Sequence, residues 1–474
     1  MTLTAKFVER VLRDLGGTEG AALCAALDAE PPVSVRLNPA KTGADTLPAG
    51  PDAGLPVPEA AGLPALAIAG RVPWSRDGRY LAVRPSFTLD PDFHAGAYYV
   101  QEASSQFVGH LLAAVRTEGA RILDLCAAPG GKTTLYASLA GPDGLVVANE
   151  IDRRRASVLA DNVRKWGTGN VAVTTCEPRA LGDFEAWFDV VAVDAPCSGE
   201  GMFRKDPDAR GEWSEGNVKQ CAARQDEILR EAWRALKPGG TLVYSTCTFN
   251  RDEDEGALER MAAWAGDEIA ESEETAVEDA WGIVCGRVGA FRTFRFYPHR
   301  TCGEGFFAAV ARKSFDAGGR VRAPKARRTV FAAVDRKTAG ELARWVRNPG
   351  GMRFAAVADT CYAWYAAQAD AVRTLSEALP VIYSGVALGQ VFKGVLKPDP
   401  ALAFFDGLNR GALHAAELDD EETLRFLRRQ DIAAGGLAEG MNLVCSRGRA
   451  LGFAKRIGAR VNNLYPNSLR IIKQ

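Results

Sequence analysis

Near residue 124 the chain reads Asp124-Leu125-Cys126-Ala127-Ala128-Pro129-Gly130-Gly131-Lys132-Thr133, a string that closes a short apolar run and opens a helical pattern. The apolar run is typical of a buried strand, and the small residues after it let a ligand approach the backbone. A triphosphate-binding loop would need glycine where Cys126 stands, and the dinucleotide fingerprint GxGxxG is also missing. We therefore expect an α/β sheet whose first loop receives a ligand without a phosphate-directed turn.

Further apolar runs follow this first one, and helical patterns separate them. The predicted strands are Ile122 to Leu125, Leu145 to Glu150, Val171 to Thr174, Val190 to Asp194 and Thr241 to Thr246. The clearest helix precedes the last strand and places on one face Cys221, Ile228, Leu229, Ala232 and Leu236. Strands that alternate with helices predict a mostly parallel sheet with helices on both faces.

Two cysteines stand in matched positions, each directly after a predicted strand. Cys197 lies in Asp194-Ala195-Pro196-Cys197-Ser198-Gly199, and Cys247 lies in Tyr244-Ser245-Thr246-Cys247-Thr248-Phe249. The carboxyl ends of parallel strands meet at one sheet edge, where ligands bind in such folds. A lone cysteine usually packs as a small hydrophobe, but this pair beside the first loop indicates thiol chemistry. The default packing role is assigned to Cys24, Cys126, Cys176, Cys221, Cys285, Cys302, Cys361 and Cys445.

The second predicted strand ends in Glu150, an acid placed to accept hydrogen bonds from a ribose diol. Together with the first loop it describes a pocket for an adenosine-type ligand. Because no phosphate-directed turn is present, S-adenosylmethionine fits this pocket better than a dinucleotide.

Composition restricts the class of protein. The 474 residues are 47% hydrophobic and 25% charged, with net charge -1, as in ordinary folded proteins of several domains. The first residues lack the apolar core of a signal peptide, and no apolar stretch approaches the roughly 20 residues of a membrane span. Ten cysteines without tandem CxxC pairs and only 4 histidines argue against disulfides and metal binding. These features predict a cytoplasmic protein without a metal site.

Charge is unevenly distributed along the chain. Basic residues gather in 312–328 and in 441–474, and acidic residues gather in 252–255 and 267–279. Each block alone could equally be a solvated face. Two basic stretches that flank one catalytic module favour a phosphate backbone as partner.

Four parts are predicted along the chain. Residues 1–95 form a small accessory lobe with a Pro/Gly-rich stretch from Pro48 to Pro64, and 96–313 form the catalytic domain. Residues 314–380 form a basic linker and a small helical region, and 381–474 form a last domain of short strands.

Four strings in this order resemble a known family. DLCAAPGGKT, DAPCSGEGMFRKDP, YSTCTF and FYPHRTCGEGFF, within residues 30–313, resemble the Sun-type RNA cytosine-5 methyltransferases, most closely the bacterial RsmF-like 16S rRNA enzymes. The strings LGFAKR and NLYP near the C-terminus are similar to the PUA-like RNA-binding end of that branch. The resemblance implies a Rossmann-like S-adenosylmethionine-dependent methyltransferase domain with a small N-terminal α+β lobe that binds RNA and a C-terminal PUA-like RNA-binding domain.

The resemblance also implies catalytic roles. Cys247 would be the nucleophile that adds to carbon 6 of cytosine, and Cys197 would assist release of the product. Asp194 would hold the N3 and amino edge of the base, and donation to N3 would require a pKa raised by burial. Lys132 would be an active-site cation that favours the thiolate, and Lys205 would do the same or contact the target nucleotide.

For the cofactor, the resemblance places the loop around the methionine part, Glu150 on the ribose, and Asp194 beside both sites. The loop residues are Cys126, Ala127, Ala128, Pro129, Gly130, Gly131 and Lys132. Adenine contact falls to Glu177, although the family more often has aspartate followed by a small residue and this chain has Glu177-Pro178. Arg155 matches a family arginine, but it could equally be a solvated helix residue.

The expected partner is RNA, in the form of 16S rRNA or the small ribosomal subunit, bound by a monomer. The same reaction on tRNA or on another rRNA site stays open, because the catalytic strings do not select the RNA. A catalytically inactive RNA-binding ribosome assembly factor is a further alternative. The intact set of Cys197, Cys247 and Asp194 weighs against it.

Overall fold

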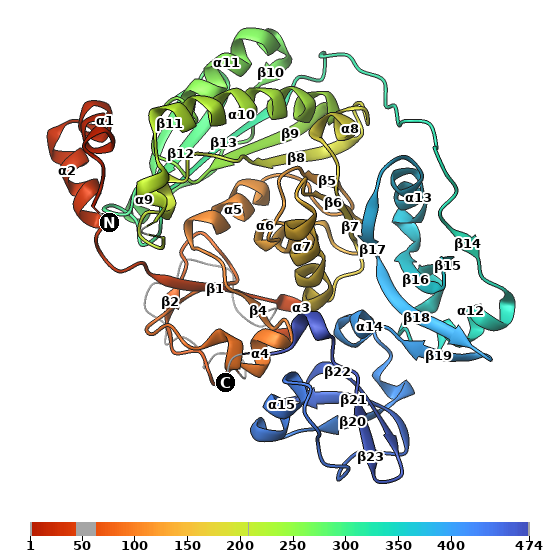
Figure 1. Ribbon diagram of the computed structural model, residues 1–474. Coiled ribbons are helices and arrows are strands. Elements are labelled where there is room, and N and C mark those ends of the chain that lie inside the picture. Colours follow the sequence, from red (N-terminus) through yellow and green to blue (C-terminus); the bar gives the residue numbers. More distant parts are fainter. Residues whose placement is uncertain (1, 44–62, 207, 473–474) are drawn as a thin grey trace.

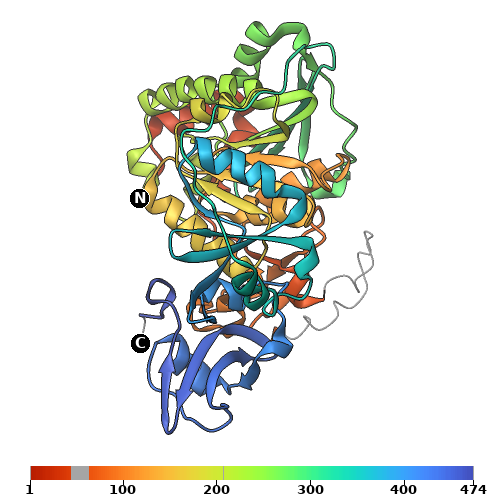
Figure 2. The same cartoon turned by 90° about the vertical axis from the view of Figure 1, so that its right-hand side faces the viewer.

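A computed structural model describes residues 2–43, 63–206 and 208–472 (Figure 1). A large mixed sheet forms the centre, and smaller sheets lie around it. In Figures 1 and 2 the C-terminal part, in blue, lies at one end of the molecule. Most of the Pro/Gly-rich stretch from Pro48 to Pro64 lies outside the described residues. Within the described ranges, no helix is long and apolar enough to cross a membrane.

The N-terminal lobe begins with a helical hairpin and continues as a small sheet of order β2-β3-β1-β4. The expected extended piece at 34–39 is strand β1 and the start of α3. The lobe comprises α1 (Ala5–Leu15), α2 (Gly17–Ala26), β1 (Val33–Leu37), α3 (Pro39–Thr42), β2 (Ile68–Arg71), β3 (Gly78–Leu81), α4 (Pro91–His94) and β4 (Tyr98–Tyr99).

The central sheet has the order β11-β12-β13-β9-β8-β5-β6-β7-β17, and β10 pairs with β13. The neighbours β9, β8, β5, β6 and β7 run parallel, which confirms the predicted fold class. Its elements are α5 (Phe107–Ala113), β5 (Arg121–Asp124), α6 (Gly131–Ala140), β6 (Leu145–Asn149), α7 (Arg153–Trp166), β7 (Val171–Thr174), α8 (Pro178–Gly182), β8 (Phe188–Asp194), α9 (Ala209–Glu212), α10 (Glu215–Ala235), β9 (Leu236–Thr246), α11 (Glu255–Ala265), β10 (Ile269–Ala270), β11 (Val284–Val288), β12 (Phe291–Phe296) and β13 (Phe306–Lys313).

Helices cover both faces of this sheet because successive strand residues point to opposite sides. Ile122 of β5 packs in a cluster with residues of α5, α6 and α7, whereas Leu123 packs in another cluster with residues of α8, α10 and α11. On α10 the expected apolar residues Ile228, Leu229 and Ala232 are buried, while Cys221 is half-buried. The two packed layers hold the strand ends at one edge.

The region after the catalytic domain differs from the expectation. The small helical region expected within 314–380 is present as Arg336–Ala343, but a sheet of order β14-β15-β16-β18-β19 also begins in this range and crosses the predicted boundary at 380. Strand β17, expected in the last domain, instead pairs with β7 at the edge of the central sheet. The elements are β14 (Ala332–Ala333), α12 (Arg336–Ala343), β15 (Met352–Val357), β16 (Thr360–Tyr365), α13 (Ala369–Ala378), β17 (Val381–Ser384), β18 (Val386–Phe392), β19 (Val395–Pro398) and α14 (Pro400–Phe404).

The sheet and the position of β17 were missed because the amino-acid pattern of this region is not typical of strands. Met352–Val357 and Thr360–Tyr365 form a hairpin in which most residues are only half-buried, so the regular alternation of buried and exposed residues that marks a strand in a sequence is missing. The short strand β17 finds its partner far away in sequence, which no local pattern reveals.

The last part of the chain forms a separate sheet of order β20-β21-β22-β23. The expected string LGFAKR lies in β22, and NLYP begins at the last residue of β23 and continues beyond it. Its elements are β20 (His414–Glu417), α15 (Asp420–Leu427), β21 (Gly440–Ser446), β22 (Arg449–Ile457) and β23 (Arg460–Asn463).

Candidate active site

The two singled-out cysteines meet at the carboxyl edge of the central sheet. Strands β8 and β9 are parallel neighbours in which Asp194 lies opposite Ser245, so the loops after them start side by side. The Sγ atoms of Cys197 and Cys247 are 3.2 Å apart, and both residues are half-buried. The structure therefore brings together two thiols that are distant in sequence.

The pKa of the Cys197 thiol lies well above its ordinary value. Its hydrogen bond with Cys247 raises the pKa of Cys197 most, and burial and the nearby charge of Glu253 raise it further. Cys197 therefore keeps its proton at neutral pH. The proton is placed where it can be shared with the sulfur of Cys247.

A buried polar cluster holds both cysteine loops. Glu253 is fully buried, and its carboxylate accepts hydrogen bonds from the backbone N–H of Ser198 at 2.9 Å and from Asn250 Nδ2 at 2.7 Å. Gln225 Nε2 of α10 donates to Glu253 at 2.9 Å and to the carbonyl of Pro196 at 3.0 Å. Such charge-assisted bonds in a buried site fix the loop geometry.

The acidic block at 252–255, which could have been a solvated face, is therefore partly interior. Glu253 and Asp254 are fully buried, and Asp254 lies 3.0 Å from Arg295 Nη1. The sequence reasoning missed these supporting residues. The available signal was their position directly after the loop of Cys247.

The first loop supplies a cation to the same edge. Lys132 Nζ lies 2.8 Å from Asp194 Oδ2, and Ser245 Oγ donates to Asp194 Oδ1 at 2.8 Å. Burial opposes the charge of Lys132, but the Asp194 carboxylate outweighs it, and the pKa of Lys132 is raised above its usual value. Lys132 also interacts electrostatically with Cys247. In this structure Asp194 accepts from two donors, an arrangement that suits a carboxylate.

Lys205 lies beside the buried carboxylate of Glu304. Its Nζ is 4.0 Å from Glu304 Oε1, and Arg204 Nη1 is 3.8 Å from Glu304 Oε2. Glu304 is buried, and neither carboxylate oxygen has a hydrogen-bond partner among the residues that the structure describes. The next residue, Gly305, directs its carbonyl to within 2.7 Å of the point where a Cβ of Gly201 would stand, and the carbonyl of Cys247 reaches the same point. Lys205 thus lies beside Glu304, and the neighbouring Gly305 and Cys247 both approach Gly201 closely.

A cavity of about 160 Å³ lies beside Lys132 and Asp194. The expected first loop forms one side of it, and residues just after β4 form the other. The lining residues are Tyr99, Val100, Gln101, Glu102, Ser105, Asp124, Cys126, Ala127, Ala128, Pro129, Gly131, Lys132 and Asp194. Cys126, expected as a packing residue, faces this cavity. Gly130, at φ +112°, instead packs toward Leu159.

The stretch from Tyr99 to Ser105 was not anticipated, because it contains no recognisable motif. Buried Arg36 of β1 connects it to the first loop: Nε donates to Gln101 Oε1 at 2.8 Å, and Nη2 donates to the carbonyl of Gly131 at 3.0 Å. The N-terminal lobe thereby completes the cavity.

The residues that line this cavity fit S-adenosylmethionine. Asp124 is buried, and burial raises its pKa to about 7. Its Oδ2 accepts from Thr133 at 2.6 Å, and its Oδ1 has no partner within the described part of the chain. A Cβ at Gly131 would meet Tyr99 at 3.3 Å, so the glycine keeps the cavity open. An acceptor without a partner and a narrow backbone cradle suit a ligand with an ammonium group and a slender chain.

The remaining expected cofactor residues lie beyond this cavity. Glu150 accepts from the backbone N–H of Asp152 at 3.0 Å and lies 3.3 Å from Arg155 Nη1. Arg155 Nη2 donates to the carbonyl of Ala128 at 3.0 Å, so this arginine connects the second strand to the first loop. Glu177 is exposed at the start of α8, and its adenine contact stays a prediction.

Comparisons with known proteins identify the family of this chain. Three family models match: the N-terminal domain of 16S rRNA methyltransferase RsmF at residues 3–103, 16S rRNA methyltransferase RsmB/F at 111–312, and the methyltransferase RsmF PUA domain at 414–471. A protein named ribosomal RNA small subunit methyltransferase F from Shewanella loihica is 31% identical over 418 residues, which cover 84% of this chain and 83% of the relative. One of the same name from Escherichia coli is 32% identical over 425 residues, covering 84% of each chain.

Solved structures share the fold. A methyltransferase homolog protein from Pyrococcus horikoshii has 27% identity and a TM-score of 0.52, covering 65% of this chain and 95% of its own. NSun6 from Pyrococcus horikoshii with SFG has 20% identity and a TM-score of 0.53, covering 65% of this chain and 98% of its own, and shows the fold alone. The relatives at and above 30% identity cover most of both chains, and the chain therefore belongs to the RsmF family of ribosomal RNA small-subunit methyltransferases.

Proposed function

We propose that this enzyme methylates carbon 5 of a cytosine in 16S rRNA through a covalent intermediate formed by Cys247 and resolved by Cys197. As a member of its family it is an RNA methyltransferase that uses S-adenosylmethionine. The observation that supports the chemical proposal is the 3.2 Å contact between the two thiols, beside the Lys132–Asp194 pair that also lines the cofactor cavity.

Carbon 5 of cytosine is a poor nucleophile until a group adds to carbon 6. In the proposed first step the thiolate of Cys247 forms a bond to carbon 6, and the displaced electron pair makes carbon 5 nucleophilic. S-adenosylmethionine, when bound, supplies an electrophilic methyl group to which carbon 5 can bond. The carbon 5 proton must then be removed, and the bond between carbon 6 and sulfur breaks with Cys247 leaving as a thiolate.

The contact between the thiols gives each cysteine a separate task. While Cys247 is a thiolate, the proton of Cys197 stabilises it, and the same interaction raises the pKa of Cys197. Once the sulfur of Cys247 is bonded to carbon 6 it is no longer an anion. The largest cause of the raised pKa is then removed, so Cys197 can release its proton to solvent and, as a thiolate, accept the proton from carbon 5. The hydrogen bond between the two thiols therefore sets the order, in which Cys247 adds to carbon 6 before Cys197 loses its proton.

Lys132 and Asp194 would act on the base. The ammonium of Lys132 favours the thiolate of Cys247 and stabilises negative charge that develops on the ring at addition. The carboxylate of Asp194, held by Ser245, accepts from the amino edge of the cytosine. Lys205, beside buried Glu304, would contact the phosphate of the target nucleotide.

The choice of 16S rRNA rests on the names of the relatives and on the matched C-terminal domain. We assign the activity to a monomer in the cytoplasm, on the grounds of cysteine usage and of an RNA-binding domain carried by the same chain. The same chemistry on tRNA would use the same residues.

The mechanism is tested by trapping the covalent intermediate. Incubation of Cys197→Ala with RNA and S-adenosylmethionine should accumulate a protein–RNA adduct that survives a denaturing gel, because release is blocked. Cys247→Ala and the double variant should give none. Cys285→Ala, which changes an exposed cysteine of β11, is the matched control and should behave as the wild type. An adduct that persists in Cys247→Ala would refute the assignment of the nucleophile.

A further inference from the structure

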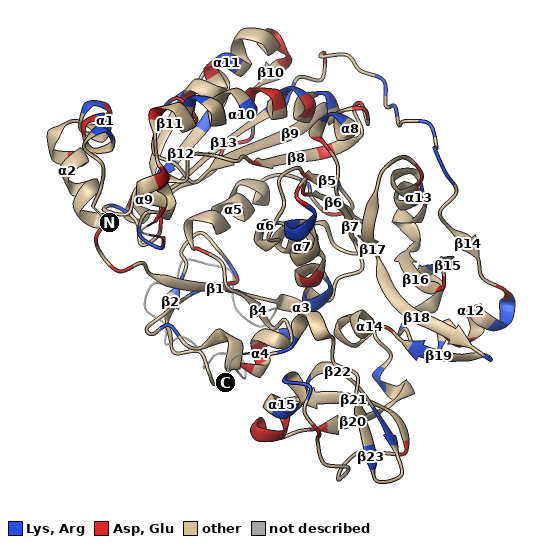
Figure 3. Ribbon diagram, in the orientation of Figure 1, with Lys and Arg blue, Asp and Glu red and all other residues tan. Residues whose placement is uncertain are grey.

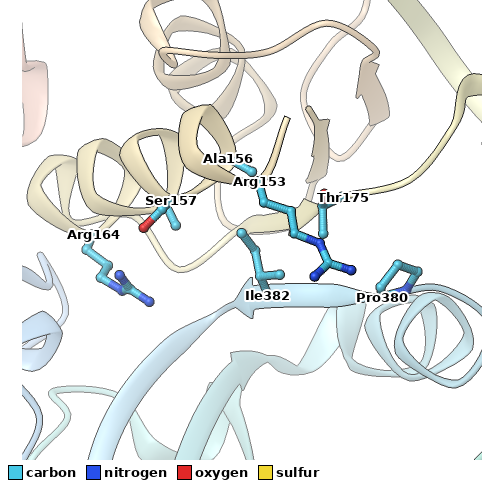
Figure 4. Close-up of a pocket in the computed structure, with 8 residues that line it drawn as sticks. Arg153, Ala156, Ser157, Arg164, Thr175, Pro380 and Ile382 are labelled. Atoms are coloured by element: carbon cyan, nitrogen blue, oxygen red, sulfur yellow. The ribbon is translucent and has the colours of Figure 1, made fainter. Parts of the chain in front are cut away.

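A second cavity, of about 490 Å³, lies on the far side of α7 from the cofactor loop. Figure 4 shows it as a groove between α7 and strand β17. Its walls include Arg153, Ser157 and Arg164 on the helix, Thr175 directly after β7, and Pro380 and Ile382 opposite the helix. Among its lining residues there are two arginines and no acid.

The helix wall carries positive charge at both ends. Arg153 and Arg164 are separated by eleven positions of α7, which spans about 16 Å at the helical rise of 1.5 Å per residue. Figure 4 shows both guanidinium groups extended along the groove, with Ser157 between them. In the described ranges Arg153 has no side-chain partner. Arg164 pairs with Asp161 at 2.7 Å and lies over the ring of Tyr383 at 4.6 Å.

The opposite wall is apolar and partly open to solvent. Ile382 is 41% exposed. The edge of this wall is basic: Arg328 Nη2 donates to the carbonyl of Leu379 at 2.9 Å, and the backbone N–H of Arg327 donates to the carbonyl of Glu377 at 2.8 Å. The basic linker that the sequence singled out therefore runs to the rim of the groove, and Figure 3 shows Lys and Arg gathered at the start of α7 as well.

We propose that this groove binds a single RNA strand at a distance from the target cytosine. Arg153 and Arg164 contact phosphates, and Pro380 and Ile382 pack against a base or ribose between them. Cations at both ends and an apolar wall between them match a strand that alternates phosphates with flat bases. The proposal rests on the proposed function in that the substrate is RNA.

The groove lies close to the reaction without being part of it. Arg155, two residues further along α7 and on its other side, donates to the carbonyl of Ala128 in the cofactor loop, while Arg153 faces the groove. An RNA strand bound in the groove would thus hold the rest of the substrate RNA against the catalytic domain. Loss of the contact should weaken RNA binding and leave the chemical step unchanged.

The test compares full-length variants in RNA binding at several salt concentrations. Arg153→Gln removes one cation that has no structural partner, and Ser157→Glu places a negative charge in the middle of the groove. Arg154→Gln is the matched control, since Arg154 is an exposed arginine of the same helix that does not line the groove. The probes are transcribed 16S rRNA and isolated small ribosomal subunits.

For Arg153→Gln we expect the slope of log K against log salt to fall by about 0.7, the value for one lost phosphate contact on a single strand. Its KM for RNA should rise severalfold while kcat and the Kd for S-adenosylmethionine stay constant. Ser157→Glu should weaken RNA binding more, and Arg154→Gln should match the wild type.

Unchanged RNA affinity and salt slope in both Arg153→Gln and Ser157→Glu, with normal cofactor binding, would overturn the proposal. A defect seen with small subunits and not with naked 16S rRNA would also overturn it, because it would indicate a protein partner. The two proposals fail separately: a wild type that makes no 5-methylcytidine refutes the proposed function, while the altered salt slope would still support the groove.

Discussion

Gly201 offers a direct way to disturb the nucleophile without touching a reactive atom. A Cβ at this position would lie 2.7 Å from the carbonyl oxygen of Cys247 and 2.7 Å from that of Gly305. Both neighbours are backbone atoms that cannot rotate away. Restoring ordinary contact at 3.4 Å requires the loop of Cys247 to move by about 0.7 Å. A displacement near 1 Å at a reacting group costs on the order of a hundredfold in rate.

We therefore expect Gly201→Ala to slow methylation by roughly tenfold to a hundredfold. The assay is single-turnover transfer of a labelled methyl group to RNA with enzyme in excess. Gly340→Ala adds the same methyl group to α12, where a Cβ would meet nothing within 4 Å, and it should react at the wild-type rate. Cofactor binding by Gly201→Ala confirms that the variant is folded. A folded Gly201→Ala enzyme that reacts within twofold of the wild type would refute the role given to this close approach.

Three further results are expected. Glu253→Gln should destabilise the protein by about 2 kcal/mol in thermal unfolding, because a buried charged acceptor is lost. It should also move the pH profile of product release to lower pH, since the charge of Glu253 raises the pKa of Cys197. An unchanged pH profile would contradict this role of Glu253. Decay of the wild-type adduct should accelerate as pH rises, because only the thiolate of Cys197 accepts the carbon 5 proton, and a rate independent of pH would argue for another base. Burial raises the pKa of Asp124 from its ordinary value of 3.8 to about 7, so the folded state binds the extra proton and stability falls as pH rises between these values. Asp124→Asn should lack this part of the pH dependence of thermal unfolding, and equal pH dependence in both proteins would count against the buried acid.

The catalytic edge could be predicted from sequence because its signals are local. The strands before Cys197 and Cys247 are continuous apolar runs, and parallel strands place their carboxyl ends together. The first loop was recognisable from its small residues, and six of its seven expected positions, together with Asp194, line one cavity. That Cys197 and Cys247 touch follows from the pairing of β8 with β9, which the alternating pattern allowed but could not specify.

The missing parts depend on contacts between residues far apart in the chain. Glu253 resembled a solvated acid until the donors Ser198 and Gln225 were placed around it. Strand β17 pairs with β7 across more than two hundred residues, and its own sequence resembles any short apolar strand. Buried polar partners and long-range strand pairing are properties of the folded chain, so composition and periodicity do not reveal them.

The central claim is tested most directly by mass-spectrometric quantitation of 5-methylcytidine after incubation of the purified protein and S-adenosylmethionine with unmodified RNA. Small ribosomal subunits, naked 16S rRNA and tRNA are treated in parallel, with Cys247→Ala as the inactive control. The account predicts 5-methylcytidine in the small-subunit rRNA and none with Cys247→Ala. Product confined to tRNA would contradict the substrate, and a methylated base other than 5-methylcytidine would contradict the chemistry.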